Sequence, residues 1–238
     1  MAAHTALITL SHGSRHPDAR TGVRELTRTA ARQLGVMGAD AHLEFDTPDL
    51  TTAARQLADQ GVTRAVVVPT LFTHAFHATY DVPEAIANAH DATGIEFIAA
   101  HGLGQGPDIA DILAARAITD IQAARRPVSQ IVLYPVGTSN EEAAGKTVEL
   151  GEGVEKRLGL RVTTAPATGY GKRDIAELAA DDAYLLPLFV TRGLLLDRAY
   201  RMWRGPASEP LGTDLAPVVA QRYAAALATL TTHEGARP

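Results

Sequence analysis

Short apolar segments alternate along the chain with longer segments that mix apolar and polar residues. Four short segments end abruptly in proline or polar residues and are predicted to be buried strands: Ala6–Leu10, Ala65–Val68, Ile131–Tyr134 and Ala183–Leu186. Weaker candidates of the same kind are Ala41–Phe45, Ile95–Ala99, Arg161–Thr164 and Pro187–Val190, the last of which can extend the strand before it.

The segments between these strands carry apolar residues at helical spacing. One such stripe stops before Gly35 and consists of Val23, Leu26, Ala30 and Leu34. Thr47-Pro48 is typical of a helix start, Asp81 and Glu84 have the spacing of a capping box, and Asn140 is placed to cap a further helix. Strand–helix alternation of this kind indicates parallel sheets covered by helices on both faces, so the expected fold class is α/β.

The two halves of the chain share an order of motifs, which indicates an internal repeat. A predicted strand runs into SHGS (11–14) in the first half and into PVGT (135–138) in the second. A later strand ends in PTLFT (69–73) in the first half and in PLFVT (187–191) in the second. We therefore expect two similar lobes, residues 1–124 and 129–238, each a parallel sheet flanked by helices, with a cleft between them. Chance similarity between two doubly wound halves is the alternative.

The composition excludes several classes of site. The chain has 238 residues and no cysteine, which removes disulfides, zinc–thiolate sites, iron–sulfur clusters and cysteine nucleophiles. Its formal net charge is −5 and it has no block of basic residues, so nucleic-acid binding is not expected. No apolar run is long enough for a membrane span, and the N-terminus lacks the features of a signal peptide. We therefore expect a soluble, cytoplasmic protein that binds neither membrane nor nucleic acid.

Histidines are concentrated in the first half, which holds eight of the nine. When the repeats are aligned, Val136 falls opposite His12 and Leu195 falls opposite His77. The second lobe thus carries apolar residues where the first carries imidazoles. This asymmetry indicates one chemical centre per chain, in the first lobe.

Two of these histidines follow predicted strands, His12 directly and His77 shortly after a strand end. Open α/β sheets bind ligands at the carboxyl ends of their strands, and imidazole suits Fe, Co, Ni or Zn better than Mg or Ca. His74 lies three residues before His77 and is a third candidate ligand. Glu44, near another strand end, is a candidate for proton removal or metal delivery. A histidine that only hydrogen-bonds in a turn, and an ordinary surface glutamate, are the alternatives.

The residues after His12 are suited to an anionic ligand. Gly13 allows close approach of the backbone, while Ser14 and Arg15 can bind a negatively charged group.

Four separated motifs together resemble the class II chelatases, the sirohydrochlorin ferrochelatases and cobaltochelatases of siroheme and cobalamin synthesis. They are SHGSR (11–15), LEF (43–45) leading to Pro48, VVVP (66–69) with His77-x-x-x-Asp81-Val82-Pro83, and Leu103-Gly104. The second half resembles the degenerate repeat of the long, duplicated members. The sequence departs from the family pattern at Thr47, where an acidic residue is frequent, and at His74, where a small or apolar residue is usual. The first departure puts an acidic cluster in doubt, and the second extends the metal site or biases the choice of metal.

The resemblance implies a lyase in which His12 and His77 hold the metal and take part in deprotonating the macrocycle. Ferrous iron is the expected metal and cobalt the alternative, in either case as a substrate, with no permanently bound cofactor. A polycarboxylate tetrapyrrole needs local cations and N–H donors. The candidate cations are Arg15, Arg192 and Arg198, and the candidate donors are the backbone N–H groups of Ser14 and Thr138. The second lobe is expected to supply apolar surface from Phe189, Leu194 and Leu195. Since one chain holds both lobes, a monomer suffices for the site.

Two rival functions stay open at this point. A non-catalytic metal or tetrapyrrole carrier needs the same histidine pair without turnover. A histidine phosphatase also has a His-Gly after its first strand, but it has an arginine where this chain has Ser11.

Overall fold

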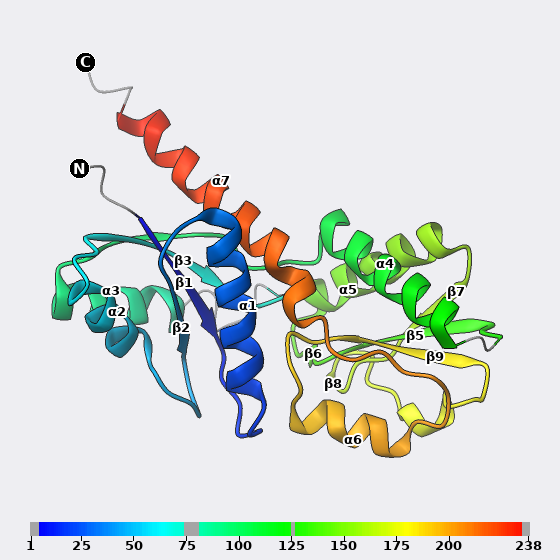
Figure 1. The fold of residues 1–238 in the computed structure, drawn as a ribbon. Coiled ribbons are helices and arrows are strands. Elements are labelled where there is room, and N and C mark those ends of the chain that lie inside the picture. The colour runs from blue at the N-terminus through cyan, green and yellow to red at the C-terminus, as the bar shows by residue number, and fades with distance from the viewer. Residues whose placement is uncertain (1–4, 74–80, 125–126, 235–238) are drawn as a thin grey trace. The chain divides into compact units, whose positions relative to one another are not determined.

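The computed structural model describes residues 5–73, 81–124 and 127–234, with side chains described up to residue 229 (Figure 1). Among these residues, none of the helices has the length and hydropathy that a transmembrane span requires. The chain divides into two compact units, which are unit 1 (Met1–Gly104 and Gly212–Pro238) and unit 2 (Gln105–Leu211).

Unit 1 is built on a parallel sheet with the strand order β2-β1-β3-β4. Its strands are β1 (Ala6–Ser11), β2 (Gly38–His42), β3 (Arg64–Pro69) and β4 (Glu96–Ala99). Its helices are α1 (Ala19–Leu34), α2 (Leu50–Ala58), α3 (Val82–Thr93) and α7 (Ala216–Glu234), with a short 3-10 helix, η3 (Gly212–Leu215), before α7. Ile8 and Leu10 of β1 pack with α2 and α3, whereas Thr9 points to the other face and bonds Thr27 of α1. Because helices cover both faces, β1 is apolar along almost its whole length.

Unit 2 is built on a three-stranded parallel sheet with the order β7-β5-β9. Its strands are β5 (Gln130–Pro135), β7 (Arg161–Thr164) and β9 (Ala183–Leu188), with a separate short pair, β6 (Gly137–Thr138) and β8 (Thr168–Gly169). Its helices are α4 (Pro107–Ala124), α5 (Glu141–Leu158) and α6 (Leu194–Met202), together with the 3-10 helix η2 (Ile175–Glu177). The fold class expected from the sequence, α/β with parallel sheets flanked by helices, is confirmed.

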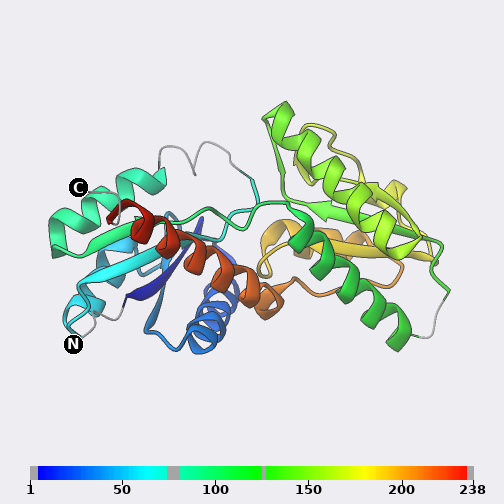
Figure 2. The ribbon, with the colours of Figure 1, turned by 90° about the horizontal axis from the view of Figure 1, so that it is seen from above.

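The division into units differs from the one expected at residues 124–129, because two helices are exchanged. Helix α4 precedes that point in sequence but packs against α5 and β9 in unit 2, while α7 returns to α1 and β3 of unit 1 (Figure 2). Asp120 of α4 accepts hydrogen bonds from the hydroxyls of Tyr184 (2.6 Å) and Ser208 (2.8 Å). The hydroxyl of Tyr223 on α7 donates to the carbonyl of Thr5 at 2.6 Å. Helical periodicity shows that a helix has an apolar face, but not which sheet that face will cover.

The strong strand predictions are confirmed to within two residues at each end, and the helix termini are confirmed only in part. Gly35 ends α1 in the left-handed conformation (φ 66°), and the Asn140 side chain accepts from Ala143 N–H to cap α5. The helix start predicted at Thr47-Pro48 is wrong, since Asp49 is the N-cap and accepts from Thr52 N–H at 2.7 Å. The carbonyl of Pro48 instead accepts the N–H of His42, which holds this residue at the end of β2. The capping box at Asp81 does not form, because Asp81 has helical dihedral angles and makes no side-chain cap hydrogen bond.

Candidate functional site

The turn after β1 is joined through the backbone to the segment after β2. Leu43 N–H donates to Ser11 C=O and Glu44 N–H donates to His12 C=O, both at 2.9 Å. Gly13 has φ +91°, and a Cβ there would overlap the carbonyl oxygen of Glu44. Only glycine therefore permits this close approach, and the approach brings the backbones of His12 and Glu44 together.

His12 is half-buried and its ring lies against an aromatic residue that sequence reasoning did not select. The His12 and Phe45 rings are stacked with centroids 5.9 Å apart and planes 11° apart. The Arg15 guanidinium lies 4.8 Å from the centroid of the same Phe45 ring. Phe45 is 54% exposed and has φ 60°. The signal in the sequence was the LEF motif (43–45), to which Phe45 belongs, and the contacts of its ring hold an imidazole and a guanidinium near each other.

A chain of buried polar side chains lies behind this turn. Ser11 Oγ is 2.7 Å from His42 Nδ1 and also accepts the N–H of Gly13 at 3.2 Å. His42 Nε2 is 3.6 Å from Asp40 Oδ2, and Asp40 Oδ1 accepts from Arg24 Nε at 3.3 Å. Burial raises the pKa of Asp40, but the neighbouring His42 imidazole and the Arg24 guanidinium outweigh this and hold the pKa below its ordinary value. Asp40 is therefore ionised at neutral pH.

The predicted site residues of unit 1 lie together at the end of β1, as far as the structure describes them. Gly13 and Ser14 follow His12, with Ser14 Oγ accepting the N–H of His16 at 3.1 Å, and Arg15 is exposed. Glu44 is exposed as well. His74 and His77 lie outside the described residues. Within the described part of the chain, no three His, Asp or Glu side chains are close enough to hold a metal ion.

The two predicted substrate-binding residues of unit 2 are already engaged by neighbouring groups. Thr138 is buried and its Oγ1 accepts the N–H of Asn140 at 3.1 Å. Arg192 Nε lies 3.8 Å from Asp197 and 3.6 Å from Glu209, with the guanidinium 5.1 Å from the centroid of the Tyr200 ring. The charge of Arg192 is therefore largely balanced within unit 2.

Unit 2 repeats the backbone of the His12 turn with different side chains. Thr168 N–H donates to Val136 C=O at 3.0 Å, and Gly137 has φ +94° with its Cβ position blocked by the carbonyl of Thr168. The expected correspondence of Val136 with His12 is thus confirmed, and the same pattern makes Thr168 the counterpart of Glu44. Both chemically active positions of the turn carry other residues in unit 2.

The apolar surface expected from unit 2 is made by partly different residues. Phe189 is 7% exposed and stacks on Tyr134 in the core, so it supplies no outer surface. Leu195 is half-buried against the same core, while Leu194 is 62% exposed. Other exposed apolar side chains of this unit include Val136 and Tyr170, both close to strand ends.

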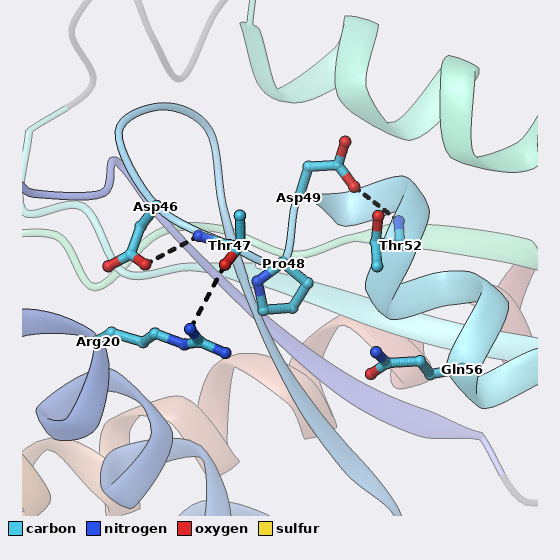
Figure 3. A pocket seen from close by; sticks show the side chains of 7 residues that line it. All are labelled: Arg20, Asp46, Thr47, Pro48, Asp49, Thr52 and Gln56. Atoms are coloured by element: carbon cyan, nitrogen blue, oxygen red, sulfur yellow. Dashed lines mark hydrogen bonds between the residues drawn. The ribbon is translucent and has the colours of Figure 1, made fainter.

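A cavity of about 370 Å³ lies in unit 1 beside the loop that connects β2 to α2 (Figure 3). Arg20 reaches into it from α1 and donates to Thr47 Oγ1 at 3.4 Å. Hydrogen bonds from Thr52 lower the pKa of Asp49, which caps α2 at its edge. The lining residues are Arg20, Asp46, Thr47, Pro48, Asp49, Thr52 and Gln56. Since none of them is an imidazole or a predicted site residue, this cavity is separate from the His12 turn.

Comparison with known proteins identifies relatives of this arrangement. The CbiX family model matches residues 6–120, which include the His12 turn and the whole sheet of unit 1. The sirohydrochlorin cobaltochelatase of Sulfurisphaera tokodaii is 32% identical over 84 residues, which are 35% of this chain and 68% of that protein. The sirohydrochlorin ferrochelatase of Priestia megaterium is 23% identical over 201 residues, covering 81% and 75% of the two chains. SirB from Bacillus subtilis with Fe3+ has the same fold, with a TM-score of 0.74 at 19% identity and 98% coverage of both chains.

Proposed function

The chain belongs to the CbiX family, and from this premise we propose that it inserts a divalent metal, with ferrous iron expected, into sirohydrochlorin. The observation that carries the proposal is the joining of His12 and Glu44 by one backbone hydrogen bond at the carboxyl edge of the unit 1 sheet. The residues that carry an imidazole and a carboxylate are therefore backbone neighbours just after the ends of β1 and β2. Both matter because metal insertion needs groups that bind a cation and groups that accept protons.

The side chains around this turn suit the steps of the reaction. Inserting a divalent metal into the macrocycle releases two pyrrole N–H protons. The His12 imidazole can bind the metal and accept a proton, the two roles that neutral imidazoles commonly have in metal sites and in acid–base catalysis. The exposed Glu44 carboxylate provides a second proton acceptor. We propose that His77 supplies the second imidazole, as the family motif implies, and that His74 adds a further ligand.

Substrate binding is proposed for the groups on either side of His12. Phe45, which is 54% exposed, offers aromatic surface to a flat macrocycle, and Arg15 beside it can pair with a substrate carboxylate. Gly13 and Ser14 line the same turn, and Thr138 and Arg192 are the proposed contacts from unit 2. Arg192 would have to exchange an existing carboxylate partner for the substrate, so we expect its contribution to be the smaller.

Both metals named for the relatives fit the same ligands, because imidazole binds iron and cobalt alike. Cobalt insertion by this site is therefore the alternative within the proposed function. We expect one chain to be sufficient for activity, with a tetrapyrrole and a divalent metal as its partners, in the cytoplasm and without nucleic acid or membrane.

The test is metal insertion with sirohydrochlorin in excess over protein, under anaerobic conditions, with Fe²⁺, Co²⁺ or Ni²⁺ and detection by absorbance. A chelatase converts many equivalents of sirohydrochlorin per chain, whereas a carrier shifts the spectrum by one equivalent at most. His90→Ala is the matched histidine control, because His90 lies on α3 and its Nδ1 is 2.8 Å from the carbonyl of Ile95. Turnover that is lost in His12→Ala and kept in His90→Ala supports the proposal; equal turnover in both would contradict it.

A further inference from the structure

The residues behind the His12 turn form a continuous buried polar chain inside a parallel sheet whose other positions are mostly apolar. Ser11, His42 and Asp40 are 8%, 2% and 9% exposed. Ser11 and His42 are partners in the register of β1 and β2, so the pairing of the strands places them side by side. Buried polar groups are costly unless they are hydrogen-bonded, which makes this cluster one that requires an explanation.

The same turn forms in unit 2 without these groups. The backbone bonds that equate Leu43 with Ala167 and Glu44 with Thr168 also equate Ser11 with Pro135 and His42 with Pro166. Gly137 nevertheless has nearly the same φ as Gly13, +94° against +91°. The Ser11 hydroxyl and the His42 imidazole are therefore not needed to form the turn. They are present in the unit whose turn carries His12.

The Ser11 hydroxyl has two hydrogen-bond partners. The N–H of Gly13 can only donate, so Ser11 Oγ accepts it at 3.2 Å. Ser11 Oγ also shares a 2.7 Å hydrogen bond with His42 Nδ1, so this hydroxyl joins the turn to the His42 ring. His42 Nε2 lies 3.6 Å from Asp40 Oδ2, which is beyond hydrogen-bond distance, and the other oxygen of Asp40 accepts from Arg24.

We propose that Ser11 and His42 are positioning residues for His12. The His42 ring holds the Ser11 hydroxyl, and the hydroxyl holds the N–H of Gly13, the residue next to His12, while the Asp40 carboxylate faces the other ring nitrogen of His42. The inference rests on the proposed function of His12 as a metal ligand and base. In this proposal the buried polar residues set the direction of the His12 imidazole from inside the sheet. The Phe45 ring stacks on the same imidazole.

The test compares Ser11→Ala with Thr9→Ala. Thr9 lies two residues earlier on β1, is fully buried, and makes a comparable 2.5 Å hydroxyl bond to Thr27 that does not reach the turn. Both variants lose a buried hydrogen bond, so we expect similar shifts in the urea midpoint. Ser11→Ala is expected to lower kcat and to weaken Co²⁺ binding, each by about 10-fold or more, because loss of a residue that orients a metal ligand has effects of this size. The KM for sirohydrochlorin is expected to be unchanged. Thr9→Ala is expected to keep kcat and Co²⁺ affinity within about 2-fold of the wild-type values, a change well below the effect of losing a residue that orients a metal ligand.

A second pair of variants keeps the inference testable if Ser11→Ala does not fold. His42→Asn keeps an acceptor near the position of Nδ1 and is expected to retain most of the Co²⁺ affinity, whereas His42→Leu is expected to lose it. Equal effects of Ser11→Ala and Thr9→Ala, or of His42→Asn and His42→Leu, would overturn the positioning role. Failure of the proposed function is distinguishable, because wild-type protein would then show no multiple turnover while the Co²⁺ titrations still compare the variants.

Discussion

The amide N–H of Glu44 donates a 2.9 Å hydrogen bond to the carbonyl oxygen of His12. Together with the bond from Leu43 N–H to Ser11 C=O, it joins the ends of β1 and β2 and makes a carboxylate and an imidazole neighbours along the edge of one sheet. The corresponding bond in unit 2 joins Thr168 to Val136 at 3.0 Å. The repeat has thus kept the backbone geometry in both units, while the imidazole and the carboxylate at these two positions belong to unit 1.

His12→Ala is expected to lower metal insertion by at least about 100-fold, the lower limit for removal of a positioned acid–base group. The protein should stay folded with a loss of about 1 kcal/mol or less, because His12 is half-buried in a turn and not part of the packed core. Turnover and urea unfolding measure the two effects. Val136→Ala, at the equivalent turn of unit 2, is the control and should keep turnover within about 3-fold, far from the acid–base effect. Normal turnover in His12→Ala would show that His12 is not required for metal insertion.

Gly13→Ala is expected to destabilise unit 1 by more than about 2 kcal/mol, beyond the usual cost of a positive φ for a residue with a Cβ. The added Cβ would overlap the Glu44 carbonyl, so the two strand ends would have to separate. Gly35→Ala is the matched control, since Gly35 also has positive φ but open space around its Cβ position. Urea unfolding should show a loss of about 1 kcal/mol for Gly35→Ala. Equal losses for the two variants would mean that the turn and the Glu44 segment are not held together.

The contribution of Asp40 to stability is expected to disappear in acid. Its folded-state pKa lies below the ordinary value of 3.8, so the stabilisation is complete above about pH 5 and is lost as the pH falls through the folded pKa. The free energy of unfolding should therefore be higher in the wild type than in Asp40→Asn at pH 7, and the difference should shrink below about pH 4. Urea unfolding at a series of pH values measures it. A difference that grows in acid would show that the carboxyl is protonated in the folded protein.

Tyr184→Phe tests the attachment of α4 to unit 2. The Tyr184 hydroxyl donates to the Asp120 carboxylate, and a hydrogen bond to a charged group contributes about 1.5–3 kcal/mol. Tyr223→Phe removes a similar hydroxyl bond to the neutral carbonyl of Thr5 in unit 1 and should cost only about 0.5–1.5 kcal/mol. Urea unfolding of both variants gives the comparison. An unchanged free energy of unfolding in Tyr184→Phe would mean that Asp120 does not anchor α4.

The sequence was sufficient for features that depend on local pattern. Apolar runs locate β1 and β5, and the repeat of Gly13 at Gly137 places Val136 opposite His12, in agreement with the backbone hydrogen bonds of the two turns. Pairings between distant residues were not accessible in the same way. Ser11 and His42 are 31 residues apart and meet only through the register of two parallel strands.

The exchange of α4 and α7 and the burial of Phe189 were missed for a related reason. An apolar helix face or an aromatic residue after a strand is compatible with several neighbours, and only the packed structure selects one. Thr168 has no motif of its own either, so its correspondence with Glu44 became visible only from the backbone hydrogen bonds.

The asymmetry between the units leads to a prediction about stoichiometry. Co²⁺ titration of metal-free protein is expected to reveal one site per chain, since Val136 and Thr168 replace the imidazole and carboxylate in unit 2. The visible absorption of bound Co²⁺ should be lost in His12→Ala and kept in Val136→Ala. Val136→His is a stronger test of this stoichiometry. Val136 is 45% exposed on the equivalent turn of unit 2, so an imidazole can replace it there without strain.

Even so, Val136→His should not create a second tight site. A single imidazole binds weakly, and Leu195 stands in unit 2 where the repeat has His77 in unit 1. The double variant Val136→His/Leu195→His is expected to approach two Co²⁺ per chain if the alignment of these positions is correct. Two sites in the wild type, or one site that survives His12→Ala, would show that the metal binds at another place in the chain.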